Sequence, residues 1–196
     1  MARKTYRLRQ GIKILSIRWQ SVKQARLHSI PNQLRNCLLD TGSLTRYLEK
    51  YCESNFSLCL KSKSWQKPLH DEADVLCLRN GEYALIREIY FKCNDTPWVY
   101  GRSIIPSRTL RGAQRRLVYW GQRSLGSYLF SEQKAFRGQM EIAKITPADT
   151  LFHLAVNPGA NQNNTLWGRR SIFYIKNKPL LIVEVFLPEL MTCINI

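Results

Sequence analysis

Two charged side chains lie inside apolar, strand-like segments, and their position is the first hint of chemistry. Glu184 is the single charged residue in the segment 180–187, and Arg87 lies beside Glu88 in the segment 84–91. A charge buried in a strand is costly unless it is paired or hydrogen-bonded. Arg87 and Glu184 therefore each have either a structural partner or a functional role.

The alternation of a strand places Arg87 and Glu88 on opposite faces. Arg87 then shares its face with Leu85, Ile89 and Phe91. If that face is inside, Arg87 offers a planar guanidinium that suits a carboxylate. The simpler interpretation is that Arg87 and Glu184 pair with each other or extend to solvent, and the pattern leaves both interpretations open.

The other candidate residues carry weaker signals. Gly42-Ser43-Leu44 and Ser124-Leu125-Gly126 resemble helix starts, whose free backbone N–H groups suit anions. Arg102 lies in a predicted strand and is a secondary candidate. Arg169 and Arg170 are neighbours that must point to opposite faces of a strand, and we interpret both as surface charges.

Motifs for metal or cofactor chemistry do not occur in the sequence. It contains no metal box, phosphate-binding loop, dinucleotide fingerprint or Ser/His/Asp arrangement. We therefore expect no metal and no cofactor. An enzyme of this kind would work by shaping its site and placing charges.

The predicted elements form neighbouring hairpins with few helices between them. Strands are expected over 56–60, 83–91, 98–105, 139–145 and in a final hairpin around Lys176-Asn177-Lys178-Pro179. Helices are expected over 31–39, 44–51, 125–130 and 149–156, with a short basic helix after Thr109, and loops over 61–74 and 157–165. This order favours an α+β fold in which helices pack on a single antiparallel sheet.

The charge of the chain is unevenly distributed. The 196 residues carry a net charge of +16, and residues 1–39 include nine Lys or Arg and no acid. We expect a basic N-terminal arm over 1–28 and one domain over 29–196. The arm could bind nucleic acid or acidic lipid or serve as a transit-like segment, but a solvated arm is the simpler interpretation, and no nucleic-acid-binding module is recognisable. The positive remainder favours an anionic small ligand.

The six cysteines show neither a Cys-x-x-Cys pair nor zinc spacing. We interpret them as reduced, structural thiols of a cytoplasmic protein. No apolar segment approaches the roughly 20 residues of a membrane span, and no secretory signal is evident. We expect a monomer that binds a small molecule.

At these residues the chain resembles the chorismate pyruvate-lyase family. The matching segments occur in family order over residues 33–188. They are Leu39-Asp-Thr-Gly-Ser-Leu-Thr-Arg46, Arg87-Glu-Ile89, Pro97-Trp98, Gly101-Arg102 with Pro106, Leu125-Gly-Ser-Tyr-Leu-Phe130, Leu166-Trp-Gly-Arg-Arg-Ser171 and Pro179-Leu-Leu-Ile-Val-Glu-Val-Phe-Leu-Pro188.

The resemblance implies an enclosed site under helical flaps and the cleavage of chorismate to 4-hydroxybenzoate and pyruvate. This reaction needs no cofactor and begins ubiquinone synthesis. By the resemblance, Arg87 binds the aromatic carboxylate, backbone groups of Leu44 and Leu125 assist, and Glu184 meets the ring hydroxyl. Two alternatives remain: a non-catalytic effector-binding domain of the same fold for a small aromatic carboxylate, and a nucleic-acid-binding protein that uses the basic arm.

Overall fold

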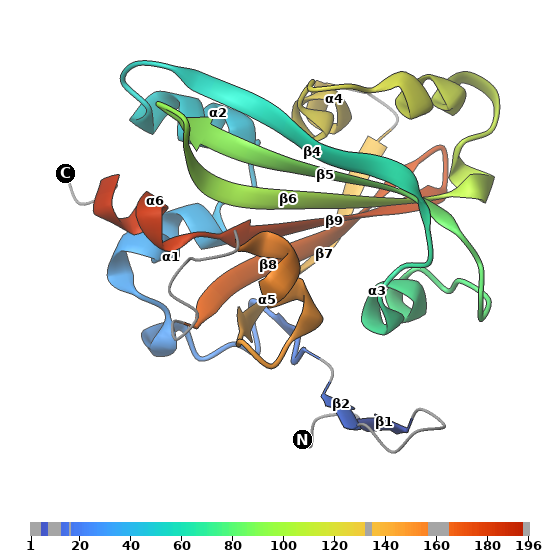
Figure 1. The fold of residues 1–196 in the computed structure, drawn as a ribbon, viewed down its shortest axis with the longest axis horizontal. Helices are drawn as coiled ribbons and strands as arrows, with labels where there is room; N and C mark the ends of the chain where they lie inside the picture. The colour runs from blue at the N-terminus through green and yellow to red at the C-terminus, as the bar shows by residue number, and fades with distance from the viewer. Residues whose placement is uncertain (1–4, 8–12, 16, 132–134, 157–164, 194–196) are drawn as a thin grey trace.

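The computed structural model describes residues 5–7, 13–15, 17–131, 135–156 and 165–193. Its centre is a seven-stranded sheet in which every neighbouring pair of strands is antiparallel (Figure 1). The strands follow one another across the sheet in the order β3 (Gln20–Ser21), β7 (Ala135–Ile145), β8 (Leu166–Ile175), β9 (Lys178–Phe186), β6 (Thr96–Pro106), β5 (Ala84–Cys93) and β4 (Phe56–Gln66). The predicted α+β class with a single main antiparallel sheet is confirmed.

Two tight turns set the register of the central strands. Asn94 and Asp95 join β5 to β6, and Lys176 and Asn177 join β8 to β9, all four with positive φ between 49° and 64°. Two-residue turns of this hand match the twist of antiparallel strands. The final turn is thus shorter than the four residues we expected, and Lys178 and Pro179 already belong to β9.

Helices cover both faces of the sheet. On one face, α1 (Asn32–Leu39) and α2 (Leu44–Tyr51) pack at one end, and the 3₁₀ helix η3 (Gly112–Tyr119) and α4 (Leu125–Ser131) pack at the other. On the opposite face, α3 (His70–Val75) and α5 (Thr150–Ala155) pack against β5, β6 and β9. Because both faces are covered, the central strands are buried along most of their length.

The remaining short elements complete the described chain. They are the two-stranded pair β1 (Thr5–Arg7) and β2 (Lys13–Leu15), the 3₁₀ helices η1 (Leu27–Ser29) and η2 (Ser107–Thr109), and the final helix α6 (Pro188–Cys193).

Several local expectations need correction. The predicted loop 61–74 is wrong for most of its length, because β4 extends to Gln66 and α3 follows. The short basic helix expected after Thr109 is the 3₁₀ helix η3, which Thr109 does not cap, because the Thr109 hydroxyl donates to the carbonyl of Pro179. Of the predicted loop 157–165, residues 157–164 lie outside the described part of the chain.

The expected boundary after residue 28 does not coincide with the edge of the fold. β3 lies within 1–28 and pairs with β7 through Gln20 and Ser21. Trp19 donates its indole N–H to the Asp71 carboxylate at 2.8 Å, and Ile17 packs on the apolar cluster under α5. The segment from about residue 17 is therefore part of the domain.

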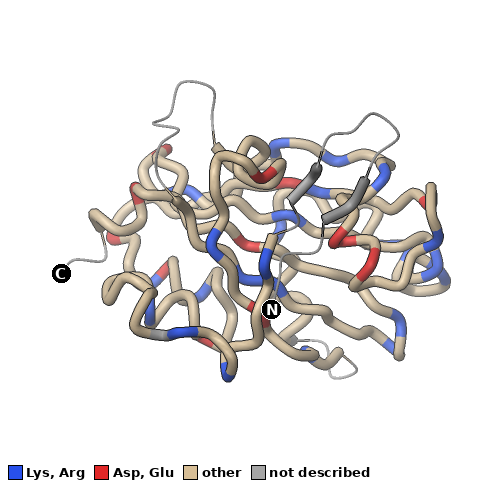
Figure 2. The backbone as a smooth tube through the Cα atoms, turned by 90° about the horizontal axis from the view of Figure 1, so that it is seen from below, with Lys and Arg blue, Asp and Glu red and all other residues tan. Residues whose placement is uncertain are grey.

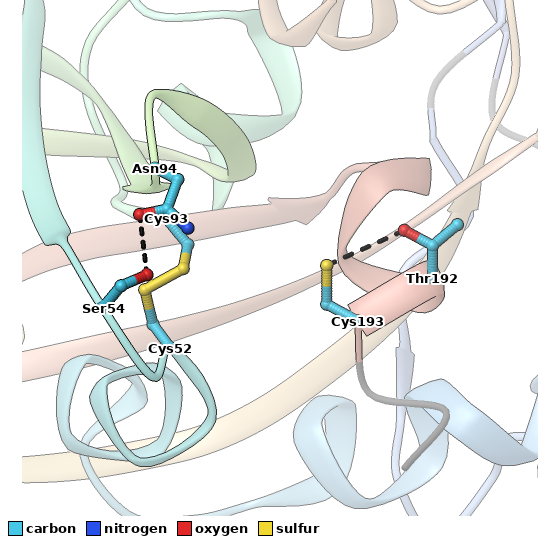
Figure 3. Close-up of a disulfide and its surroundings, with 6 residues drawn as sticks. All are labelled: Cys52, Ser54, Cys93, Asn94, Thr192 and Cys193. Carbon is cyan, nitrogen blue, oxygen red and sulfur yellow. Dashed lines mark hydrogen bonds between the residues drawn. A yellow bond between two sulfur atoms is a disulfide. The ribbon is translucent and has the colours of Figure 1, made fainter.

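The expectation of six reduced cysteines is also wrong. Cys52 and Cys93 form a disulfide that joins the end of α2 to the end of β5 (Figure 3). Beside it, Ser54 donates to the Asn94 side chain at 2.7 Å. Cys37, Cys59, Cys77 and Cys193 are free. Two cysteines 41 residues apart carry no local spacing signal, so the pairing depends on the tertiary fold.

Candidate functional site

A pocket lies between the sheet and the two helices α2 and α4. Its empty space is about 520 Å³, including the opening to solvent. The sheet side is formed by residues of β5, β6, β9, β8 and β7, and the other side by the first residues of α2 and α4. The lining residues are Gly42, Leu44, Thr45, Arg87, Ile89, Phe91, Gly101, Ser103, Leu125, Gly126, Phe130, Arg137, Arg169, Ser171, Phe173, Ile182 and Glu184.

Arg87 brings a buried positive charge into this pocket. Its side chain is only 2% exposed, and it donates to the carbonyl oxygens of Gly121 (2.9 and 2.7 Å) and Arg123 (2.7 Å). No carboxylate among the described residues pairs with it. Burial lowers the pKa of Arg87 to about 10. A guanidinium held by neutral carbonyls keeps its charge available for an anionic ligand.

Glu184 faces the same pocket but has its own partner. Arg169, 1% exposed, donates its Nε to Glu184 Oε2 at 2.5 Å. The same guanidinium also donates to the carbonyls of Cys37 (2.9 Å) and Asp40 (2.6 Å). The suggested pair of Arg87 with Glu184 is therefore not formed. Glu184 Oε1 has no hydrogen bond to any described residue, which leaves it free to accept one from a ligand.

The interpretation of Arg169 and Arg170 as surface charges is wrong. Both are buried, Arg169 on the pocket face and Arg170 on the opposite face, where it pairs with Glu141 (2.7 Å) and Asp71 (3.2 Å). A signal for Arg169 was present in the sequence. A two-residue turn at 176–177 makes Arg169 the direct cross-strand neighbour of Glu184.

Arg102, the secondary candidate, does not line this pocket. It lies on the opposite face of β6, where it pairs with Glu72 (2.8 Å) and Glu88 (2.7 Å). Tyr100 donates its hydroxyl to the same Glu88 carboxylate. These pairs fix α3 on the sheet, so Arg102 has a structural role there. The partner Glu72 belongs to the segment we expected to be a loop.

The helices α2 and α4, which we call the flap helices, meet over the pocket through hydroxyl groups of side chains at their starts. Thr45 and Ser124 are joined at 2.6 Å, and Ser43 and Ser127 at 3.2 Å. Ser124 also caps α4 by accepting from the backbone N–H of Ser127 at 3.0 Å. Ser43 stands at the start of α2 without making a capping bond, because its hydroxyl is directed to α4. The helix starts at Leu44 and Leu125 thus lie together above the sheet.

The pocket has an excess of positive charge. Its lining includes three guanidiniums, those of Arg87, Arg137 and Arg169, and the single carboxylate of Glu184. Arg137 was not singled out from the sequence. Most of the remaining lining is apolar or small. Across the described residues, no group of three or more His, Cys, Asp or Glu is arranged to hold a metal ion.

A helix long and apolar enough to cross a membrane does not occur in the described part of the chain.

Solved structures with a similar fold include an effector domain and a transcriptional regulator. The effector domain of PhnF from Mycobacterium smegmatis has a TM-score of 0.52 at 14% identity, covering 77% of this chain and 91% of that one. A GntR-family regulator from Bacillus cereus has a TM-score of 0.51 at 14% identity, with coverages of 69% and 94%. At this identity the likeness concerns the fold.

Other proteins are similar to this chain in sequence and share more identical residues with it than these solved structures do. A protein of Nitrosospira multiformis named probable chorismate pyruvate-lyase is 37% identical over 163 residues, which cover 83% of this chain and 91% of that protein. One of the same name from Methylococcus capsulatus is 36% identical, with coverages of 81% and 97%. The family described as chorismate lyase matches residues 14–196. The match extends over nearly the whole chain, and the chain therefore belongs to the chorismate lyase family.

Proposed function

We propose that the protein cleaves chorismate to 4-hydroxybenzoate and pyruvate, the first committed step of ubiquinone biosynthesis. Membership of the family supports the reaction class. The observation that carries the proposal for this chain is the buried guanidinium of Arg87, held by two carbonyls and without a carboxylate partner among the described residues. It lies in a pocket whose other walls include Ile89, Phe91 and Phe173.

The spacing of Arg87 and Glu184 suits a ring with two opposite polar groups. Glu184 pairs with Gly101, and Arg87 pairs with Ser103, so one strand separates the two charged residues. Strands lie about 4.8 Å apart, which places the two backbones about 10 Å apart across the sheet. Between them, the side of β6 that faces the pocket bears Gly101 and Ser103, and the side chains of Ile89 and Phe91 lie close above Gly101.

In this arrangement each site residue has one role. Arg87 binds the ring carboxylate, backbone groups of Leu44 and Leu125 contact the substrate from the flaps, and Glu184 accepts a hydrogen bond from the ring hydroxyl. Arg169 acts as a positioning residue, because its ion pair fixes Glu184 Oε2 and leaves Oε1 without a hydrogen bond among the described residues. Arg102 is left out of the site, since it lies on the other face of the sheet.

The chemistry demands little beyond orientation. Loss of the C4 hydrogen and the enolpyruvyl group makes the ring aromatic, so the step is strongly downhill. The enzyme must hold a reactive conformer and keep water out. The hydrogen can pass to the enolpyruvyl methylene within the substrate or through acid–base steps, and both routes are compatible with these residues.

The direct test is to incubate the purified protein with chorismate and to measure 4-hydroxybenzoate and pyruvate by chromatography. We expect both products in equal amounts, with no added cofactor and no effect of exhaustive chelation. Binding of 4-hydroxybenzoate without any turnover would instead identify a non-catalytic effector-binding domain. This domain is the second candidate, because an effector domain has a similar fold. Light scattering and cell fractionation test the expected monomer and its cytoplasmic location.

A further inference from the structure

Resting on the proposed function, we propose that Arg137 binds the second carboxylate of the substrate, the one on the enolpyruvyl group. Arg137 would thus orient the group that leaves and afterwards hold the carboxylate of pyruvate. The starting point is a mismatch in the pocket. Chorismate brings two carboxylates, whereas the roles assigned above use only one, at Arg87.

The backbone of β7 is shaped to bring Arg137 to the pocket face. Ile142 pairs with Arg169 and Met140 with Ser171, so regular alternation would next place residue 138 on this face. The register shifts between Arg137 and Met140, and Arg137 becomes the neighbour of Phe173 instead. Bulges of this kind redirect side chains and are frequent beside active sites. The bulge therefore places the Arg137 side chain in the lining of the pocket.

The contacts of Arg137 leave its charge uncompensated. Its guanidinium donates to the Ser171 hydroxyl (2.8 Å), to the Thr41 carbonyl (2.9 Å) and to the Met140 sulfur (3.3 Å). All three acceptors are neutral, and a thioether is a weak acceptor. No described carboxylate forms an ion pair with Arg137. Burial and the nearby charge of Arg169 lower the pKa of Arg137, an effect that Glu184 and Asp40 partly offset.

The two remaining basic groups of the pocket are not equivalent to Arg137. Arg169 is paired with Glu184 and also donates to two backbone carbonyls. Arg87 is assigned to the ring carboxylate. Two guanidiniums without a carboxylate partner, Arg87 and Arg137, thus face a substrate with two carboxylates. Charge-assisted bonds of this type are the strong ones in recognition of carboxylates.

This assignment separates substrate from product. The product 4-hydroxybenzoate has one carboxylate and a hydroxyl, which Arg87 and Glu184 satisfy without Arg137. Removing the Arg137 charge should therefore weaken the handling of chorismate and pyruvate but leave the binding of 4-hydroxybenzoate nearly unchanged. Removing Arg87 should weaken both ligands.

The experiment compares Arg137→Met with Arg87→Met and with Arg115→Met, which removes the same charge from the exposed surface of η3. We expect Arg137→Met to lower kcat/KM for chorismate by about 10- to 150-fold, the range for a lost charged hydrogen bond. Its inhibition constant for 4-hydroxybenzoate should change less than about threefold, against a loss of about tenfold or more in Arg87→Met. Inhibition by added pyruvate should weaken in Arg137→Met, and Arg115→Met should match the wild type.

A purely structural role of Arg137 predicts a different result. Loss of its bond to Thr41 would then disturb the flap and weaken chorismate and 4-hydroxybenzoate alike, and that outcome overturns the proposal, as does unchanged kcat/KM. Arg137→Lys, which retains the charge, should recover part of the lost activity and provides a second test if Arg137→Met does not fold. If the wild type binds chorismate without cleaving it, the proposed function fails, and titration of both ligands by calorimetry still decides the role of Arg137.

Discussion

The partners of the buried charges separate the residues that hold the fold from those that face a ligand. On the far face of the sheet, Arg102 is matched by the carboxylates of Glu72 and Glu88. On the pocket face, Arg87 has only backbone carbonyls. A buried ion pair is complete in itself, whereas a buried cation on neutral acceptors gains from an added anion. This contrast supports Arg87, and not Arg102, as the anchor of the substrate.

We expect Arg87→Lys to weaken the binding of both chorismate and 4-hydroxybenzoate. The change keeps the charge but removes the planar fork and its two bonds to Gly121. A charged hydrogen bond is worth about 1.5–3 kcal/mol, which corresponds to about 10- to 150-fold in affinity. Calorimetric titration with 4-hydroxybenzoate measures the effect. Affinity equal to that of the wild type would remove Arg87 from the site.

The lowered pKa of Arg87 predicts an unusual pH dependence of anion binding. Only the protonated guanidinium attracts a carboxylate, and its pKa in the free protein is about 10. Benzoate affinity should thus be constant near neutral pH and fall as the pH rises through about 10, before an ordinary arginine would lose its proton. Benzoate is the suitable probe because it lacks a phenol that titrates in this range. Melting curves at each pH must show a folded protein, and constant affinity up to pH 11 would contradict the prediction.

For Glu184 we expect Glu184→Gln to lower kcat more than it lowers the affinity for 4-hydroxybenzoate. The amide retains an oxygen for Arg169 but loses the negative charge that meets the hydroxyl. Breaking the ion pair should also reduce stability. Glu141→Gln is the matched control, since it breaks the adjacent pair with Arg170 on the opposite face. It should lower the melting temperature and leave kcat unchanged. Normal turnover by folded Glu184→Gln would end the assignment.

At the scale of elements, local patterns predicted well and long-range pairings did not. The strand pair at 83–105 and the helix starts at Leu44 and Leu125 were predictable because alternation, turn residues and capping residues are local signals. The bulge that redirects Arg137 depends on the fit of β7 to β8, and its sequence shows no regular alternation that would reveal it. Arg137 is therefore a charged pocket residue that only the tertiary structure identifies.

The disulfide is the element-scale feature with the clearest stability effect. It ties the end of α2, whose first turn lies over the pocket, to the end of β5. Closing a loop of this length typically stabilises a fold by about 2–4 kcal/mol. We expect a dithiol reductant to lower the melting temperature of the wild type but not that of Cys93→Ser, which should already melt at the lower value. Cys59→Ser, which removes a free cysteine, should behave as the wild type. Insensitivity of the wild type to reductant would restore the expectation of reduced thiols.

At the scale of the whole molecule, the net charge of +16 is spread over many elements and not confined to the N-terminus (Figure 2). Several of the basic residues have defined tasks inside the fold, as Arg87, Arg169 and Arg170 show. The net charge is therefore weaker evidence for a partner than the buried arginines are for a ligand. A count of charged residues in the sequence cannot separate buried from exposed basic residues, because burial depends on which strands pair.

The contacts of β3 and Trp19 change what we expect from shortening the N-terminus. Removal of residues 1–13 retains the entire family match, which begins at residue 14, and should leave melting temperature and turnover unchanged. Removal of residues 1–28 also deletes β3 and Trp19. Trp19 bonds to Asp71, and the Arg170 guanidinium lies 4.6 Å from the centre of its ring.

The longer deletion uncovers the edge of β7 and leaves the pair of Arg170 with Asp71 without its aromatic cover. A loss of about 2–3 kcal/mol corresponds to a fall of roughly 5–10 °C in the melting temperature of a domain of this size. Calorimetry of the two truncated proteins beside the full chain measures it. Trp19→Ala in the full chain should reproduce part of the fall, because it removes the indole and keeps β3. Equal melting temperatures for both truncations would return the boundary to residue 28 and make the whole basic arm dispensable.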